Sequence, residues 1–544
     1  MSILAVTAGL ALSVPARAAS EVRTITRDGV TLMYERVTKP TTPRHGTGAT
    51  RSDFDGDGID DIAATGQPMS YDLPGNPTGV LAVRYSSAPQ VDYFLGVLPP
   101  TDGGCGCFGD GQATGDFNGD GYDDLAIGDS DERDPRNGAN AGGLWVIPGS
   151  AAGLVVDSAQ HFNQSSSGVP GDSEQDDKFG GTLAAGDLNG DGRDDLAVGA
   201  WNEAIGSTVS AGTVTVLFGS ASGLTGANAQ YLHQNQAAVP GAAERNDNFG
   251  MSLAIGKVNK DRYADLVIGA PHENDGQSWN GSGMVTLMWG SAGGVSSTGA
   301  TAVTGGEILW ATGSPNTVAW YLGSSLAVGD VNGDGYGDVI VGAPQAQGPD
   351  INSGLVAVFT GRSGGLYNRA VRVITQATAG VPGAPEGGDL FGGALAAGDV
   401  TGDGKADVLV GVPGEALGST TESGMITLLK GSAGGLIGTG SQGFDESNSV
   451  IPGAPERGDR FGASVAVLNY NGTGPLDAVV AAPGEEVPGD QAGYPSGLMT
   501  PLLGSSGGLV PQSAQWTGAT LRTDHLWPKS YGTRIAGPQS SYGY

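Results

Sequence analysis

Residues 179–200 read FGGTLAAGDLNGDGRDDLAVGA, and this stretch decides the fold because its three parts recur along the chain. It opens with a Phe-Gly pair, continues into a nine-residue acidic loop at 187–195 and ends in a short apolar run. Equivalent runs at 265–271 (DLVIGAP) and 338–344 (DVIVGAP) are rich in β-branched residues and too short for helices. Each run therefore predicts a buried β-strand.

The acidic loop occurs seven times. Five well-formed copies begin at residues 53, 116, 187, 330 and 399, and two weaker copies occupy 257–265 and 469–477. Successive starts are between 63 and 73 residues apart. Eight residues before each start stands a Phe-Gly pair or its counterpart, so the repeat units begin near 45, 108, 179, 249, 322, 391 and 461.

Each unit holds two further strands. A third apolar run ends in a Gly-Ser-x-x-Gly-Leu turn, as at 219–224 and 431–436, and a fourth strand leads to the next unit. Four short strands per unit, repeated around an axis, bury each blade against two neighbours. The sequence therefore predicts an all-β fold, a seven-bladed β-propeller of four-stranded antiparallel blades.

The order of these motifs resembles that of a known family. Phe-Gly, then a DxDGDGxxD loop, then Gly-Ala-Pro is similar to the FG-GAP repeat of integrin alpha-chain propellers and of many secreted bacterial proteins. The resemblance covers about residues 45–520, with departures in the first, fourth, fifth and seventh units. It implies a propeller that binds calcium in the turn between the first two strands of a blade.

The composition of the loop also favours a hard cation. Oxygen-bearing side chains at positions one, three, five and nine can surround calcium, and glycines at positions four and six permit the turns. A single such loop could be an acidic β-turn, but five near-identical copies argue against that reading. We expect about five Ca²⁺ sites, formed by Asp53, Asp55, Asp57 and Asp61; Asp116, Asn118, Asp120 and Asp124; Asp187, Asn189, Asp191 and Asp195; Asp330, Asn332, Asp334 and Asp338; and Asp399, Thr401, Asp403 and Asp407.

The two weaker loops depart from this pattern. In 257–265, Lys257 replaces the first ligand, and Lys260 and Arg262 replace the glycines, so an empty loop is expected with an ammonium group in place of the ion. The loop 469–477 has Asp477 as its one carboxylate, so any binding there is expected to be weak.

Composition excludes several classes of function. The chain has 544 residues, 57 acidic and 26 basic, and a formal charge of −31, which would repel phosphate backbones, so nucleic acid is not an expected partner. A bridge between Cys105 and Cys107 would be strained and would close almost no loop, so no disulfide framework is expected. Two thiols are also too few for a structural zinc site.

The ends of the chain predict export and ring closure. Residues 1–18 read as a signal peptide that ends at Ala16-Arg17-Ala18, with an uncleaved anchor as the alternative, and no transmembrane segment is expected in the mature chain. Residues 19–44 form an N-terminal segment in which 22–36 could add an outer strand to the last blade. Residues 45–520 form the propeller. The tail, 521–544, contains Tyr531-Gly532, which resembles the start of an eighth unit, so either terminus could close the ring.

Antiparallel blades place their connections on two faces. The acidic loops and the Gly-Ser turns share one face, here called the acidic face, and the connections after the second and fourth strands share the other, the variable face. The variable face is the candidate ligand face, and its aromatic and acidic mixture suits a sugar or a protein, although such aromatics can also simply cover the blade ends. The candidate residues are Trp201, His272, Trp279 and Trp320.

These features favour a secreted, monomeric, non-catalytic recognition or adhesion module for an extracellular protein or glycan. The alternative is a propeller-based extracellular enzyme, such as a polysaccharide lyase or a phospholipase-like hydrolase, and a third reading is a structural subunit of a surface assembly. The Arg-Gly-Asp at 457–459 and the G-x-S-x-G patterns at 361–365 and 504–508 fall in repeated connections, which accounts for them without adhesion or hydrolysis. The sequence does not name the ligand.

Overall fold

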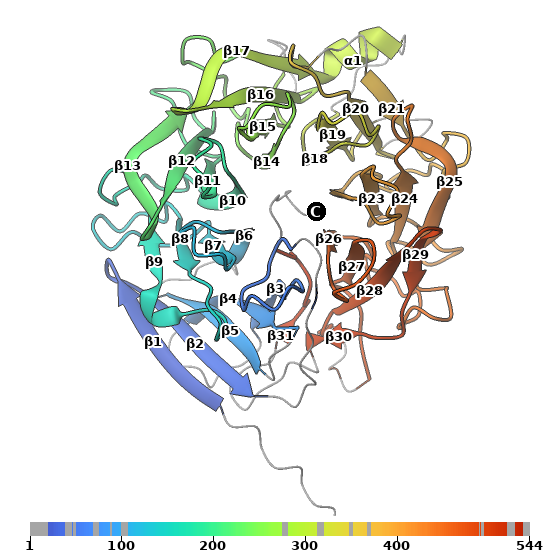
Figure 1. Ribbon diagram of the computed structural model, residues 1–544, viewed down its shortest axis with the longest axis horizontal. Helices are drawn as coiled ribbons and strands as arrows, with labels where there is room; N and C mark the ends of the chain where they lie inside the picture. The colour runs from blue at the N-terminus through green and yellow to red at the C-terminus, as the bar shows by residue number, and fades with distance from the viewer. Residues whose placement is uncertain are drawn as a thin grey trace, which may run out of the picture.

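Seven antiparallel sheets stand around a central axis in the computed structural model (Figure 1). The structure describes residues 20–38, 46, 50–68, 76–86, 90–98, 107–274, 281–312, 320–346, 352–366, 371–488, 490, 494–518 and 528–536. The predicted seven-bladed β-propeller is confirmed. The expected signal peptide at 1–18 lies outside the described residues, as does the candidate ligand residue Trp279.

Five consecutive blades are regular, with four strands each in chain order from the centre of the ring to its rim (Figure 1). They are β6 (Phe108–Gly115), β7 (Asp124–Asp129), β8 (Gly143–Ile147) and β9 (Gln160–Phe162); β10 (Phe179–Gly186), β11 (Asp195–Ala200), β12 (Thr213–Ser220) and β13 (Gly223–Leu232); β14 (Ser252–Gly256), β15 (Asp265–Ala270), β16 (Met284–Ser291) and β17 (Gly294–Thr304); β18 (Ser325–Gly329), β19 (Asp338–Ala343), β20 (Leu355–Phe359) and β21 (Val371–Ile374); and β22 (Ala394–Gly398), β23 (Asp407–Val412), β24 (Met425–Lys430) and β25 (Ile437–Phe444).

The second strand of each regular blade is buried at every residue, as in β11 and β23. A strand with packed neighbours on both faces has no solvent side, which explains apolar runs without alternation. A short helix, α1 (Gly305–Thr312), follows β17, and a 3₁₀ turn, Val156–Ser158, precedes β9.

The first and seventh blades carry extra strands. The seventh contains β26 (Ser464–Leu468), β27 (Asp477–Ala482), β28 (Leu498–Ser505) and β29 (Gly508–Pro511), with β30 (Trp516–Thr517) also paired to β28. The first contains β1 (Ser20–Arg27), β2 (Val30–Thr38), β3 (Ile62–Pro68), β4 (Asn76–Arg84), β5 (Gln90–Leu98) and β31 (Pro528–Lys529) in the order β1-β2-β5-β4-β3-β31. The N-terminal hairpin thus lies at the rim of the first blade rather than on the last blade.

The C-terminal segment provides the innermost strand of the first blade. β31 pairs with β3, the N–H of Thr65 donates to the carbonyl of Arg534 at 3.0 Å, and the N–H of Gly532 donates to the carbonyl of Thr65 at 2.8 Å. Tyr531 is 1% exposed and donates its N–H to the carbonyl of Ser496. Phe461, at the start of the seventh unit, donates to the carbonyl of Ser423 in the same way. First and last blades are therefore joined by strand pairing.

The pair His45-Gly46 does not lead into an inner strand as the repeat pattern suggested. Gly46 instead donates its N–H to the carbonyl of Asp57 within the first acidic loop. The physical reason is that Tyr531-Gly532 already fills the corresponding place. His45 itself lies outside the described residues.

The hydrophobic core is divided among the junctions between blades. The described residues form seven buried clusters, and each cluster combines side chains of two neighbouring blades. The cluster that contains Tyr93 and Tyr531 joins the first blade to the seventh. Each blade is therefore stabilised by its neighbours, as in other repeat architectures.

Cys107 is disulfide-bonded, contrary to the expectation that strain disfavours a bridge. The other cysteine of the chain, Cys105, lies outside the described residues.

Candidate metal-binding loops and the opposite face

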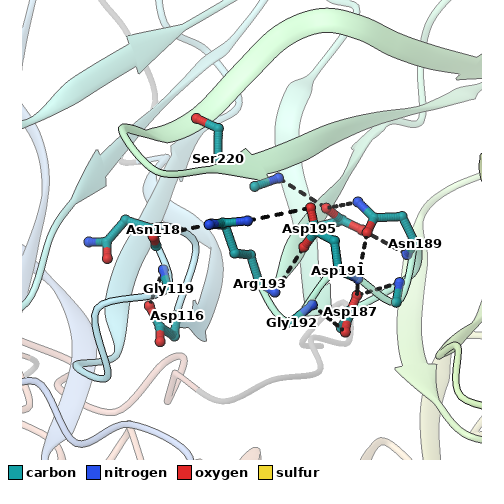
Figure 2. Close-up of polar contacts among 12 residues, drawn as sticks. Asp116, Asn118, Gly119, Asp187, Asn189, Asp191, Gly192, Arg193, Asp195 and Ser220 are labelled. Atoms are coloured by element: carbon teal, nitrogen blue, oxygen red, sulfur yellow. Dashed lines mark hydrogen bonds and ion pairs between the residues drawn. The ribbon is translucent and has the colours of Figure 1, made fainter. Parts of the chain in front are cut away.

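The third acidic loop shows how these residues fold locally (Figure 2). One oxygen of Asp187 accepts the N–H groups of Gly190 and Asp191 at 2.6 and 3.1 Å, and the other accepts that of Gly192 at 3.0 Å. Gly190 and Gly192 have φ values of +73° and +86°, a region that favours glycine. The first carboxylate therefore closes the loop around itself.

The third and ninth positions meet beneath this turn. Asn189 donates its side-chain N–H to Oδ1 of Asp195 at 3.1 Å. Oδ2 of Asp195 accepts the N–H of Leu188 at 3.0 Å, and Oδ1 accepts that of Gly219 at 3.0 Å. The ninth carboxylate thus connects the loop to the turn between the third and fourth strands. Asp191, at position five, is exposed and lies 3.7 Å from the Arg193 guanidinium.

The other four well-formed loops repeat the turn. In each, the first aspartate accepts N–H groups from the residues three, four and five positions later, and these aspartates are Asp53, Asp116, Asp330 and Asp399. The sequence pattern therefore corresponds to one local structure in all five copies.

The first loop holds three acids in close range. Asp53, Asp55 and Asp57 each offer an oxygen, and these oxygens lie within 4.8 Å of one another. Oδ2 of Asp57 also accepts the hydroxyl of Ser86 at 2.6 Å. The equivalent loops at 116, 187 and 330 have asparagine at position three, and the loop at 399 has threonine.

The ninth carboxyls are perturbed by their surroundings. Burial raises the pKa of Asp124 and of Asp195 to about 7, opposed by the backbone N–H groups that donate to them and reinforced by neighbouring loop carboxylates. The pKa of Asp338 rises to about 6 for the same reasons. A cation within the loop would oppose this shift because it stabilises the ionised form.

The two weaker loops lack the turn made by the first aspartate. Lys257 and Lys260 are both exposed, and the Lys260 ammonium lies 3.9 Å from the centre of the Tyr336 ring in the next blade. The Lys260 ammonium therefore does not take the place of the ion in its own loop, contrary to expectation. In the last loop, Asn471 donates to Asp477 at 2.8 Å, and Asn469 donates to the carbonyl of Gly58 at 3.1 Å.

Backbone hydrogen bonds connect all seven loops in a closed ring. The N–H at position eight of each loop donates to the carbonyl at position one of the loop in the preceding blade, at 2.7 to 3.1 Å. The ring includes the bond from Asp60 in the first blade to Asn469 in the seventh. Where position eight is aspartate, its carboxylate also accepts an N–H from the neighbouring loop, as Asp194 does from Asp116. The donor pairs are 60 to 469, 123 to 53, 194 to 116, 264 to 187, 337 to 257, 406 to 330 and 476 to 399.

The donor set of the five loops fits a hard cation. Every side chain at the first, third, fifth and ninth positions carries oxygen, and none carries sulfur or imidazole. Calcium prefers such ligands and tolerates irregular geometry. Backbone donors to the first and ninth carboxylates position these groups within each loop.

On the variable face, the structure brings two candidate ligand residues together through Asn248. Asn248 donates its side-chain N–H to the carbonyl of Trp201 at 3.0 Å, and its side-chain oxygen lies 2.7 Å from Nδ1 of His272. Both Trp201 and His272 are partly exposed. Trp320 is only 3% exposed and packs in the core between two blades, so it cannot face a ligand.

The Arg-Gly-Asp tripeptide is not displayed as a recognition motif. Asp459 is 1% exposed, and one of its oxygens accepts the N–H of Glu456. A partner cannot contact a carboxylate that is buried in this way.

A set of buried contacts between blades is not evident from the repeat motifs. The side chains of Gln164, Gln234 and Gln376 donate to Glu203, Glu273 and Glu415 at 2.5, 2.8 and 2.6 Å. Each glutamate follows its glutamine by 39 residues, and this constant offset within the repeat is the sequence signal that could have revealed the pairs.

In the described part of the chain, no helix has the length and apolar character that crossing a bilayer requires.

Comparisons with known proteins identify the repeat. Five segments match the FG-GAP repeat family, at residues 108–147, 179–217, 249–288, 322–359 and 391–429. These segments are the second to sixth of the seven predicted units. The first and seventh units lie outside the matches, although both form blades.

Similar proteins include a phospholipase and two integrin alpha chains. Phosphatidylinositol-glycan-specific phospholipase D of Rattus norvegicus is 31% identical over 189 residues, which cover 34% of this chain and 20% of that protein. Integrin alpha-PS2 of Drosophila melanogaster is 26% identical over 283 residues, or 51% of this chain and 17% of that protein. Integrin alpha-7 of Rattus norvegicus is 33% identical over 170 residues, covering 30% and 12% respectively. The chain thus spans a fifth or less of the length of these relatives.

Proposed function

Because the chain is an FG-GAP-repeat β-propeller similar to integrin alpha chains, we propose that it is a secreted, calcium-binding recognition module without catalytic activity. The observation that carries the calcium assignment is the common turn of the five loops. In each loop, the first aspartate accepts hydrogen bonds from three backbone N–H groups. Further side-chain oxygens that could bind a metal ion lie in the same loop. The metal ligands are the side chains at positions one, three, five and nine.

Calcium would add substantially to the stability of the ring. At millimolar calcium and a dissociation constant of about 0.1 mM, each site contributes about 1.4 kcal/mol, and five sites contribute roughly 7 kcal/mol. That sum is comparable with the net stability of a typical domain, about 5 to 15 kcal/mol. The ions therefore act as structural supports in this proposal.

Removal of calcium tests the assignment directly. The melting temperature should fall by many degrees when excess EGTA replaces 1 mM CaCl₂, and the five loops should account for about five of the ions that equilibrium dialysis finds per chain. Magnesium at the same concentration is the matched control, because it demands a stricter octahedral geometry and should restore less of the lost stability. An identical melt with and without EGTA would refute the proposal.

The partner is proposed to bind the variable face. Three of the five exposed large apolar side chains of the described surface, Val209, Val450 and Tyr494, lie in connections of that face. Trp201 and His272 add a partly exposed aromatic pair there. An extracellular glycan or protein is the ligand class that such a mixture suits.

Array binding with a variant identifies the face. Saturable binding of one glycan or protein at fixed calcium, lost in His272→Ala and retained in Lys405→Ala on the acidic face, would support the proposal.

The likeness to a phospholipase D, 31% identical over 189 residues, favours an enzyme as the second candidate function. Turnover in a phospholipase and polysaccharide lyase screen, abolished by His272→Ala, would favour that alternative.

Export is proposed from the sequence of the first 18 residues. An apolar segment followed by Ala16-Arg17-Ala18 fits signal peptidase cleavage. Mass spectrometry of protein recovered from the culture medium should find a mature N-terminus near Ala19. Retention of the intact N-terminus in a membrane fraction would indicate an anchor instead.

A further inference from the structure

Four junctions between blades share one arrangement on the variable face. A side chain just after the fourth strand of one blade faces a glutamate that follows the second strand of the next blade. At three junctions the first residue is glutamine, and its amide N–H donates to the glutamate, as Gln376 does to Glu415 at 2.6 Å. The donated hydrogen bond satisfies one carboxylate oxygen.

At the remaining one of these four junctions, between the sixth and seventh blades, an acid stands in place of the glutamine. Glu446 occupies this place between the sixth and seventh blades, two residues after β25. It is 4% exposed, and no N–H or hydroxyl group of the described residues donates to either of its carboxylate oxygens. Burying a carboxylate without a partner is costly, so this side chain requires a neutralising group.

Two further buried acids face Glu446. Asp459 is 1% exposed and Glu485 is 4% exposed, and one oxygen from each of the three side chains lies within 4.8 Å of the others. Two oxygens that bind one calcium ion, each at about 2.4 Å, lie no more than about 5 Å apart. The spacing therefore fits three ligands of one ion.

The surrounding backbone positions the three acids. One oxygen of Asp459 accepts the N–H of Glu456, and this bond orients the carboxylate. Gly453, at φ +100°, borders the cluster, and a Cβ there would lie 2.7 Å from Oε1 of Glu446 and 3.0 Å from Oε1 of Glu485. The glycine thus leaves room that any side chain would fill.

The electrostatic surroundings also favour a cation. Burial, followed by repulsion from Glu485 and Asp459, raises the pKa of Glu446 to about 10. Burial and repulsion from Asp459 raise that of Glu485 to about 8, with Glu456, Asp490 and Glu486 adding to the repulsion. One proton would neutralise one of the three carboxyls, whereas a divalent ion attracts all of them.

We propose that Glu446, Asp459 and Glu485 form a divalent-cation site between the sixth and seventh blades, on the face opposite the acidic loops. Its ligands are carboxylate oxygens, so a hard ion, calcium or magnesium, is the expected occupant. The site joins two blades, because Glu446 follows the sixth blade and Glu485 belongs to the seventh. It is independent of the five loops and of the ligand that the variable face binds.

The substitution Glu446→Gln tests the site, because glutamine is the residue found at the other three junctions. Equilibrium dialysis with CaCl₂, and separately with MgCl₂, should find one ion fewer per chain than in the unaltered protein. In EGTA the variant should melt at a higher temperature than the unaltered protein, since the new amide can donate to Glu485 as the glutamines donate to their glutamates at the other three junctions. The gain in melting temperature on adding the ion should be smaller in the variant.

The reciprocal substitution provides the matched control. Gln376→Glu places a third acid beside Asp389 and Glu415 at the preceding junction and should add one ion. The acidic loops contribute equally to all three proteins, so their failure to bind would lower every total and leave these differences intact. Equal ion counts in the unaltered protein and in Glu446→Gln, with equal gains on adding the ion, would overturn the proposal and assign a proton to Glu446.

Discussion

At the scale of single residues, the first aspartate of each acidic loop has two roles. Its oxygens accept three backbone N–H groups, as in Asp187, and they are also the proposed first ligand of the ion. The carboxylate has lone pairs for both roles, since two oxygens offer about four acceptor sites. Lys257, which takes this place in the fourth loop, offers neither.

Asp187→Asn should therefore remove one calcium ion while retaining much of the loop turn. The amide keeps one acceptor oxygen but loses the negative charge, and one site is worth about 1.4 kcal/mol at millimolar calcium. Equilibrium dialysis and melting with and without EGTA measure both effects. Asp261→Asn, in the loop that starts with Lys257, should leave the ion count unchanged, and a drop there would contradict the assignment of ligands.

At the scale of strands, a glycine before the third strand of each of the five regular blades lets neighbouring blades approach closely. Gly424, at φ +83°, precedes β24 and bridges Phe461 of the next blade. A Cβ at Gly424 would lie 2.3 Å from the carbonyl oxygen of Phe461. No real side chain tolerates that contact, so the junction would have to move.

Gly424→Ala should destabilise the propeller more than Gly440→Ala does. Both glycines have φ near +80°, which costs alanine about 1 kcal/mol, but Gly440 has no atom within 4 Å of a Cβ. The clash at Gly424 should add about 1 to 3 kcal/mol of strain. Urea denaturation of the two variants measures the difference, and equal losses would show that the backbone conformation alone matters.

At the scale of the whole molecule, two features close the ring. The segment 528–536 provides the inner strand of the first blade, and seven backbone hydrogen bonds connect the acidic loops around the ring. Both pass across the junction between the first and seventh blades. Closure also removes the two free edges that an open array of blades would expose.

A chain ending at Gly518 should lose this closure. It would leave Thr65 without its bonds to Gly532 and Arg534 and would uncover the core around Tyr531. We expect a lower melting temperature and association of chains through the exposed edge of β3 in analytical ultracentrifugation. A chain ending at Ala536 is the control, and it should remain monomeric. Equal behaviour of the two would mean that the terminal strand is dispensable.

The sequence by itself determined the number of blades, the strand pattern and the local form of the acidic loops. These features depend on residues close together in the chain, and the motif for each of them occurs in several repeat units. Asp187, Asn189, Asp191 and Asp195 lie within nine residues, so their turn follows from local geometry. For the same reason, the seventh blade was predicted although it lies outside the family matches.

Only the tertiary structure decided what meets across the blade junctions. Tyr531 reaches the first blade from the far end of the chain, and the burial of Trp320 depends on neighbours from two blades. Glu446 and Glu485 are 39 positions apart in the chain, and the structure brings them together. Comparison with the other three junctions, which have glutamine in place of Glu446, shows that an extra acid is buried here. Closing a ring brings distant segments together, and burial at such a junction depends on both partners rather than on either sequence alone.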